Sequence, residues 1–149
     1  LKESIEATNL LDRTIKEQLF SYIDNLEDCK VLCHGDFHPD NILISKERNV
    51  VIDWMTATLG NPLGDVARTA VIFKFAYIPE DKSFIEKGII NFIRKKFYEE
   101  YIKNYCFSTN TKIEDIEKWE LPIAAARLVE HLPSQEKSIL VNFIKNKIH

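Results

Sequence analysis

Long apolar runs are missing from this 149-residue sequence. The longest one, between Val71 and Ile78, is interrupted by Lys74. It is far shorter than the about 20 residues that a helix needs to cross a bilayer. The first residues also lack the pattern of a signal peptide. We therefore expect no membrane partner.

An excess of basic residues is missing as well. The chain has 20 Lys and Arg against 23 Asp and Glu, a formal net charge of −3 with histidine neutral. This mildly acidic balance argues against nucleic acid as the main partner. With 45% hydrophobic and 29% charged residues, the composition is typical of a folded domain rather than a disordered chain. The length predicts one compact domain over residues 1–149.

Cysteine and methionine are scarce. Cys29, Cys33 and Cys106 are odd in number and lack the dense spacing of a disulfide framework, so we expect buried structural thiols and a cytoplasmic location. The only methionine is Met55, and Leu1 is too large for an initiator methionine to be trimmed from in front of it. We therefore expect these residues to be part of a longer polypeptide, whose function needs segments outside this sequence.

Hydrophobic spacing predicts the elements. Apolar residues at steps of three and four predict an amphipathic helix over residues 2–26. Short β-branched runs predict a strand at 30–33 and a hairpin over 42–53, with Asp53 as its last residue. Further helices are expected at about 62–77, 84–106, 113–119, 122–131 and 133–147, with prolines in the first turns of the last two. The sequence thus predicts an α+β fold that is predominantly α-helical.

The unusual residue choices lie in two loops at the ends of the expected hairpin. The first loop, residues 34–41, reads HGDFHPDN, and the second loop, residues 54–64, lies between Asp53 and Asp65. A carboxylate at the end of an apolar strand is costly without a positive partner, which makes Asp53 a candidate metal ligand. Asn41 begins the partner strand, so the two side chains can converge on one cation. Their oxygen atoms suit Mg²⁺, which takes other ligands from water and phosphates.

Asp36 lies five positions before Asn41 and would face whatever lies beyond a metal-bound phosphate. Phosphoryl transfer needs one carboxylate to accept a hydroxyl proton, and an amide and a second carboxylate to hold magnesium on the nucleotide. The segment HGDFHPDN, followed by IDW and GNPLGDVA, resembles the catalytic and metal-binding segments of the aminoglycoside phosphotransferase and choline kinase-like family. The resemblance covers residues 31–69, and the remaining helices are compatible with the C-terminal lobe of these protein kinase relatives.

The resemblance implies an ATP- and Mg²⁺-dependent kinase that phosphorylates a hydroxyl of a small molecule, such as an aminoglycoside or choline. It makes Asp36 the catalytic base and Asn41 and Asp53 the magnesium ligands. In the same scheme, His34 and Asp65 support the site structurally.

The resemblance further implies that Leu43 and Ile52 form the floor under the adenine. The family's phosphate-covering loop and its Lys–Glu pair have no match here, since the four glycines are scattered. We therefore expect the N-terminal nucleotide-covering lobe of the same polypeptide to be absent, and the isolated chain to be inactive.

Two other functions remain open. Alternating His34, Asp36, His38 and Asp40 could ligate the metal of a hydrolase, although this leaves Asp53 and Asp65 without a role. The chain could also be a non-catalytic binding lobe, although intact catalytic and metal positions argue against it.

Three side chains near the end of the sequence have two interpretations. Arg127, Glu130 and His131 lie where family members often place substrate-facing side chains, but we expect a solvated helix face.

Two further residues near the loops are expected to have no role in the chemistry. His38 is expected to be an exposed loop histidine. Trp54 is expected to be a packing anchor.

Overall fold

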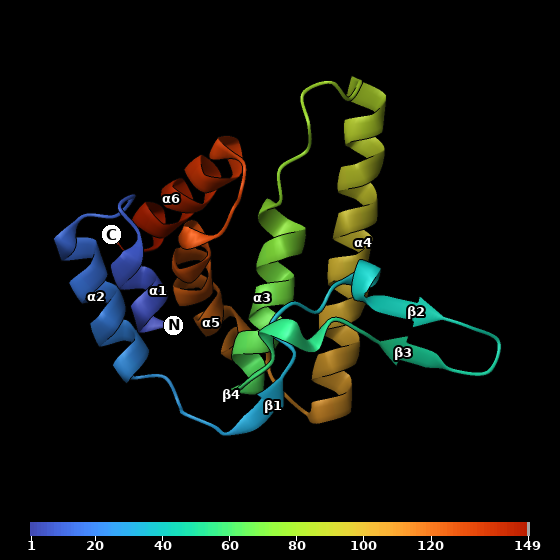
Figure 1. Ribbon diagram of the computed structural model, residues 1–149, viewed down its shortest axis with the longest axis horizontal. Helices are drawn as coiled ribbons and strands as arrows, with labels where there is room; N and C mark the ends of the chain where they lie inside the picture. The colour runs from blue at the N-terminus through green and yellow to red at the C-terminus, as the bar shows by residue number, and fades with distance from the viewer. Residues whose placement is uncertain (149) are drawn as a thin grey trace.

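The computed structural model describes residues 1–148 as a helical body with two small sheets (Figure 1). The predicted predominantly helical α+β fold is confirmed. The helices are α1 (Lys2–Ala7), α2 (Arg13–Asp24), α3 (Pro62–Phe75), α4 (Phe84–Thr109), α5 (Ile113–Ala126) and α6 (Ser134–Ile148). The strands are β1 (Val31–Cys33), β2 (Ile42–Ile44), β3 (Asn49–Val51) and β4 (Thr58–Gly60), and short 3₁₀ turns cover Pro39–Asn41, Trp54–Thr56 and Arg127–Val129.

The first predicted helix is interrupted. Residues 2–26 form α1 and α2 with a break between them, because polar side chains there bond to the backbone. The hydroxyl of Thr8 accepts a hydrogen bond from the N–H of Leu10 at 3.3 Å, and Asp12 caps α2 by accepting from the N–H of Ile15 at 2.9 Å. Such local bonds compete with the helix and favour a new start.

Each sheet is one antiparallel strand pair. The predicted hairpin is present as β2 and β3, with Leu43 opposite Val50. The strand β1 pairs with β4, which lies inside the segment expected to be a loop. Because β4 has only three residues and ends at Gly60, it shows no alternation that a sequence pattern could reveal. Asp53 lies two positions beyond the end of β3 rather than on the strand.

The helix α5 is continuous where the sequence predicted two helices. Pro122 lies inside it rather than in a first turn. Proline has no N–H, so the carbonyl of Lys118, four residues earlier, loses its helical donor. The hydroxyl of Tyr22 donates a hydrogen bond to this carbonyl at 2.9 Å. A contact from α2 therefore replaces the missing helical bond, and the helix ends at Ala126 rather than continuing to residue 131.

The helix α3 lies between α4 and α5 in the body of the molecule (Figure 1). Its buried residues belong to two apolar clusters, one shared with α1, α2, α5 and α6 and one shared with α4 and α5. The first turns of α3 bind the first loop through Asp65 and Thr69, so the packed core supports this loop. None of the described helices is long and apolar enough to cross a membrane.

Candidate functional site

Asp65 connects the first loop to α3. It lies in the first turn of the helix, which Asn61 caps by accepting a hydrogen bond from the N–H of Leu63 at 2.9 Å. The two carboxylate oxygens of Asp65 accept hydrogen bonds from the N–H groups of His34, at 2.8 Å, and Gly35, at 2.7 Å. One side chain thus fixes two successive peptide groups of the loop.

Gly35 has a backbone conformation that suits only glycine. Its φ is +78°, and a Cβ atom there would collide with the carbonyl oxygen of Thr56 in the second loop. The hydroxyl of Thr56 also donates a hydrogen bond to the carbonyl of His34 at 3.1 Å. The two loops are therefore in direct contact at this glycine.

His34 uses both ring nitrogens within the protein. The side chain is buried, with Nε2 2.9 Å from the carbonyl oxygen of Ile52 and Nδ1 accepting from the N–H of Asp36 at 3.2 Å. These partners make Nε2 the donor. The ring centroids of Trp54 and His34 are 4.7 Å apart. Trp54 therefore packs against His34, although it is half-exposed rather than a buried anchor. With both nitrogens occupied, His34 has no free position for a metal.

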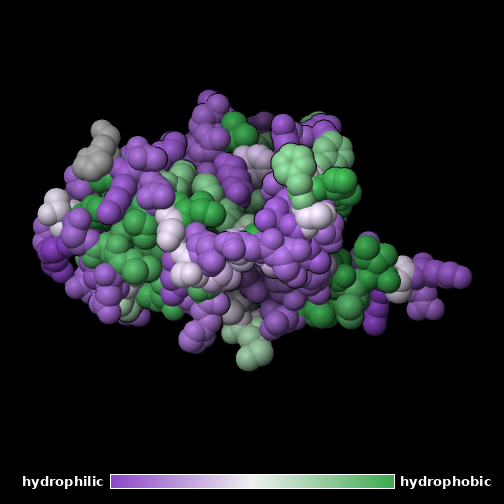
Figure 2. All heavy atoms as spheres, turned by 90° about the horizontal axis from the view of Figure 1, so that it is seen from above, coloured by the Kyte–Doolittle hydropathy of each residue, from purple (hydrophilic) through white to green (hydrophobic). Residues whose placement is uncertain are grey.

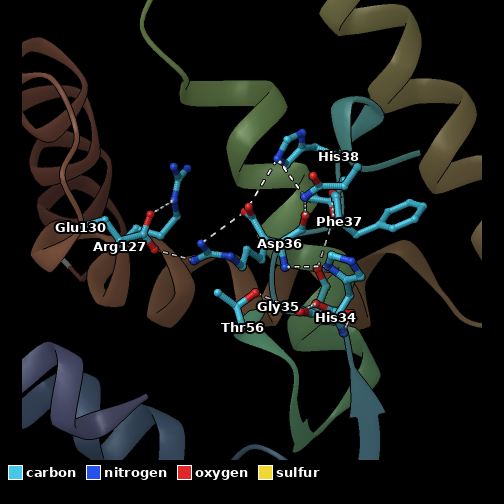
Figure 3. Close-up of polar contacts among 12 residues, drawn as sticks. His34, Gly35, Asp36, Phe37, His38, Thr56, Arg127 and Glu130 are labelled. Atoms are coloured by element: carbon cyan, nitrogen blue, oxygen red, sulfur yellow. Dashed lines mark hydrogen bonds and ion pairs between the residues drawn. The ribbon is translucent and has the colours of Figure 1, made fainter. Parts of the chain in front are cut away.

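The Asp36 carboxylate lies between two basic side chains (Figure 3). Its Oδ1 is 3.5 Å from Nη2 of Arg68, and its Oδ2 is 3.4 Å from Nε2 of His38. A third of the Asp36 side chain is exposed, so it remains open to a substrate. His38 is only 25% exposed, which corrects the expectation of an exposed loop histidine.

Asn41 joins the first loop to the end of the hairpin. It is buried, and its side-chain N–H donates to the carbonyl of Asp36 at 2.8 Å. Its own carbonyl accepts from the N–H of Ile52 at 2.9 Å. The amide oxygen is thus the atom that Asn41 can offer to a metal.

Asp53 follows Ile52 and has a left-handed backbone, with φ 59° and ψ 62°. Positive φ is uncommon for residues other than glycine and costs about 1–3 kcal/mol, so the surrounding structure must impose it. The side chain is exposed. Its carboxylate and the amide oxygen of Asn41 are each oxygen donors of the kind that Mg²⁺ accepts when phosphates and water complete its shell.

A denser metal cluster is not found in the described part of the chain. No three His, Cys, Asp or Glu side chains within residues 1–148 lie together as a metal site. His38 lies 3.4 Å from Asp36 and 3.7 Å from Asp40, but these residues do not form a metal site, and His34 is bound to backbone groups instead.

The hairpin carries an exposed apolar face. Its register, extended by the bond from Ile52 to Asn41, places Leu43, Val50 and Ile52 on one side. Leu43 is 55% exposed, and Ile44 on the other side is 82% exposed. The hairpin stands out from the body, with apolar side chains between the body and its polar tip (Figure 2).

Helices α3 and α4 support the far side of the first loop. The Tyr101 ring stacks on Phe37 with ring centroids 5.7 Å apart, and the hydroxyl of Thr69 donates to the carbonyl of Phe37 at 2.7 Å. Burial raises the pKa of Tyr101 to about 12. It also raises the pKa of the Cys33 thiol, the buried one of the three cysteines.

The sequence did not predict the ion pairs that lie beside Asp36. Arg68 binds Glu130 through Nη1 and Oε1 at 2.6 Å, and Nε of Arg127 lies 3.2 Å from Oε2 of Glu130. Arg127 is 5% exposed, so the expected solvated helix face is wrong for this residue. Glu130 is partly buried and His131 is exposed. The available signal was the charge of Arg68 in a mainly apolar stretch of the sequence, three positions after Asp65.

A cavity of about 510 Å³ lies beside these residues. Its lining comes mainly from β1, β4, α3 and α5, and includes Cys33, Gly35, Asp65, Arg68 and Glu130. The first loop thus borders open space as well as the core.

Comparison with known proteins gives concordant results. The phosphotransferase enzyme family matches residues 3–109. Acyl-CoA dehydrogenase family member 10 of Mus musculus is 31% identical over 100 residues, which are 62% of this chain and 9% of that protein. Acyl-CoA dehydrogenase family member 11 of Mus musculus is 39% identical over 85 residues, 54% of this chain and 10% of that protein. The chain thus spans about a tenth of these curated relatives.

A solved structure shares the fold. The crystal structure of a thermostable mutant of aminoglycoside phosphotransferase APH(4)-Ia, in its apo form, matches with a TM-score of 0.55 and 16% identity. The match covers 93% of this chain and 44% of that chain.

Proposed function

The chain belongs to the phosphotransferase enzyme family, and on this premise we propose that it carries the reaction centre of an ATP-dependent small-molecule kinase. The observation that supports the proposal best is the Asp36 carboxylate, which is partly exposed on a loop fixed by Asp65 and by Asn41. Phosphoryl transfer depends on positioning and on charge neutralisation, and a rigid loop with a carboxylate provides the first of these.

In this proposal, Asp36 accepts the proton of the acceptor hydroxyl, whose oxygen forms the new bond to phosphorus. Asn41 and Asp53 hold Mg²⁺ through their side-chain oxygens. ATP with its magnesium supplies the γ-phosphoryl group, whose bond to the bridging oxygen of the β-phosphate breaks so that ADP leaves. In this proposal His34 and Asp65 transfer no proton to or from the substrate, because their polar atoms are engaged by the backbone of the loops.

The nucleotide site is completed outside this chain in our proposal. Leu43 and Ile52 share the exposed hairpin face and would form the floor under the adenine. We propose that the chain is the C-terminal lobe of the enzyme and that an N-terminal lobe of the same polypeptide covers the nucleotide. The large exposed area of apolar hairpin side chains supports this proposal.

The acceptor is proposed to be a small hydroxyl compound. The solved structure above is an aminoglycoside phosphotransferase, and the curated relatives are named as acyl-CoA dehydrogenase family members. A panel of aminoglycosides, choline and hydroxylated acyl-CoA compounds, assayed with ATP and Mg²⁺, would identify the acceptor class.

Asp36→Asn tests the proposal in the polypeptide that carries both lobes. Asparagine keeps the shape but cannot take a proton, so turnover should fall by about 10²- to 10⁴-fold while ATP affinity changes little. The measurement is steady-state kinetics together with nucleotide titration.

Asp40→Asn is the matched control, because Asp40 lies in the same loop with its side chain 96% exposed. It should leave turnover unchanged. Equal turnover of Asp36→Asn and wild type would reject Asp36 as the base. A loss with Asp40→Asn, together with a tightly retained transition metal, would favour the hydrolase alternative.

A further inference from the structure

We propose that Arg68, held in place by Glu130, is a positioning residue for Asp36; this inference rests on the proposed kinase function. Arg68 lies on α3 and is 21% exposed. Its two terminal nitrogens contact different carboxylates, Nη2 at 3.5 Å from Asp36 and Nη1 at 2.6 Å from Glu130. The guanidinium thus bridges the proposed base and a second carboxylate from the other side of the site.

Glu130 is itself fixed by a buried network. Its Oε2 lies 3.2 Å from Nε of Arg127, and Nη2 of Arg127 lies 3.2 Å from Oε1 of Glu136. The other oxygen of Glu136 accepts from the N–H of Tyr77, just beyond the end of α3, at 2.8 Å. Figure 3 shows Arg127 and Glu130 on the side of Asp36 away from His38. Glu130 is therefore a stationary support for Arg68.

The orientation of Arg68 is that of a bridge between two carboxylates. Its Nε is buried and has no hydrogen-bond partner in the described structure. A guanidinium that bound one carboxylate through Nε and a terminal nitrogen, by two parallel bonds, would satisfy this N–H. Arg68 instead leaves a buried donor unpaired and reaches two carboxylates.

The consequence is a fixed carboxylate plane at Asp36. Arg68 contacts Oδ1 and His38 contacts Oδ2, so Arg68 sets, together with His38, the carboxylate orientation that the acceptor hydroxyl would meet. Proton transfer requires a defined geometry, and a shift of about 1 Å can lower the rate 10²-fold. Arg68 acts through Asp36 and does not itself touch the reacting atoms.

Arg68→Lys tests the role in the two-lobed polypeptide. Lysine keeps the charge but cannot bridge two carboxylates as a planar fork. We expect kcat to fall by about 10- to 100-fold, while KM for ATP and for the acceptor stays within about threefold. Glu130→Gln should lower kcat as well, and the double variant should be no slower than Arg68→Lys, because Glu130 acts through Arg68. A kcat of Arg68→Lys within twofold of wild type would overturn the inference.

Glu120→Gln is the matched control for stability. Lys74 of α3 and Glu120 of α5 form a partly buried ion pair, with Nζ and Oε1 2.7 Å apart. This variant should lower the Tm about as much as Glu130→Gln but leave kcat unchanged. Equal losses of kcat in both variants would mean that helix packing alone is responsible, and would overturn the positioning role.

A second measurement separates this inference from the proposed function. The carboxyl ¹³C resonance of Asp36 can be followed in the 149-residue chain without any nucleotide. Glu130→Gln should shift it through Arg68, and Glu120→Gln should not. If the wild-type enzyme phosphorylates no acceptor, the proposed function fails. The resonance of Asp36 then still tests whether Arg68 and Glu130 position this side chain. An unmoved resonance in Glu130→Gln would overturn the positioning role even in an active enzyme.

Discussion

Two glycines give opposite predictions for the same substitution. Gly35→Ala places a methyl group against the Thr56 carbonyl at a φ of +78°, and Gly88→Ala places one in open space on α4. Left-handed backbone alone costs an alanine about 1–2 kcal/mol, and the collision adds to it. Alanine inside a helix gains about 1 kcal/mol over glycine. Urea unfolding should therefore show Gly35→Ala less stable, and Gly88→Ala more stable, than wild type.

The two substitutions should change the free energy of unfolding in opposite directions, so each variant is a control for the other. If both variants moved stability in the same direction, the close approach of the two loops at Gly35 would be wrong. A loss of phosphotransferase activity in Gly35→Ala alone would agree with a loop that must keep its shape.

Asp65→Asn probes the connection between the first loop and α3. An asparagine has one acceptor oxygen, so either His34 or Gly35 would direct its N–H at an amide NH₂. An unsatisfied donor of this kind costs about 1–3 kcal/mol. Urea unfolding should show this loss, and hydrogen exchange should quicken at the two N–H groups. The exposed Asp40→Asn should show neither effect, and equal stability of Asp65→Asn would remove the bracing role.

Residues close in sequence were the easiest to assign to the site. His34, Asp36 and Asn41 lie in one polar loop, and Asp65 lies at the predicted start of a helix, so their spacing was visible as a pattern. The pair Arg68 and Glu130 is separated by 62 positions. Nothing local distinguishes such residues from solvated charges, because only the packing of α3 against α5 and the following turn brings them together.

At the scale of elements, periodicity predicted most helices and the hairpin. It was wrong where one side chain decided the outcome. The break before α2 depends on the cap of Asp12, and the continuity of α5 depends on the hydroxyl of Tyr22. The strand β4 exists because β1 pairs with it, and a three-residue strand has too few positions to show a period.

The contact of α4 with the first loop predicts a pH dependence. Burial raises the pKa of Tyr101 to about 12, from the 10.0 expected in the unfolded chain. Because the folded pKa is higher, the contribution to stability is complete below pH 10 and is lost as the pH rises toward 12. Two pKa units correspond to about 2–3 kcal/mol. Urea unfolding between pH 9 and 12 should therefore show a steeper loss for wild type than for Tyr101→Phe.

Absorbance at 295 nm provides an independent check of this tyrosine. At pH 11, Tyr101→Phe should contain about one unionised tyrosine fewer than wild type, because the pKa of Tyr101 is about 12. Identical pH profiles of unfolding in the two proteins would show that Tyr101 ionises like a solvated phenol. The packing of α4 against the first loop would then not bury this side chain.

At the scale of the molecule, the core and the proposed nucleotide face are separate. The two apolar clusters surround α3, and the hairpin contributes to neither. Exposed Leu43, Ile44 and Val50 on a projecting hairpin are the surface that a nucleotide and a covering lobe would bury. This arrangement explains why the fold can form around α3 while the nucleotide site remains open on one side.

The last prediction follows from that open side. The purified 149-residue chain should fold, with cooperative urea unfolding, yet show little or no ATP turnover, because in our proposal a lobe outside this chain covers the phosphates. The scattered glycines Gly35, Gly60, Gly64 and Gly88 provide no phosphate-covering loop. The two-lobed polypeptide should turn over ATP with an acceptor, and Asp36→Asn should lower this turnover by about 10²- to 10⁴-fold. Robust acceptor-dependent turnover by the 149 residues alone would show that one lobe suffices and would overturn the two-lobe proposal.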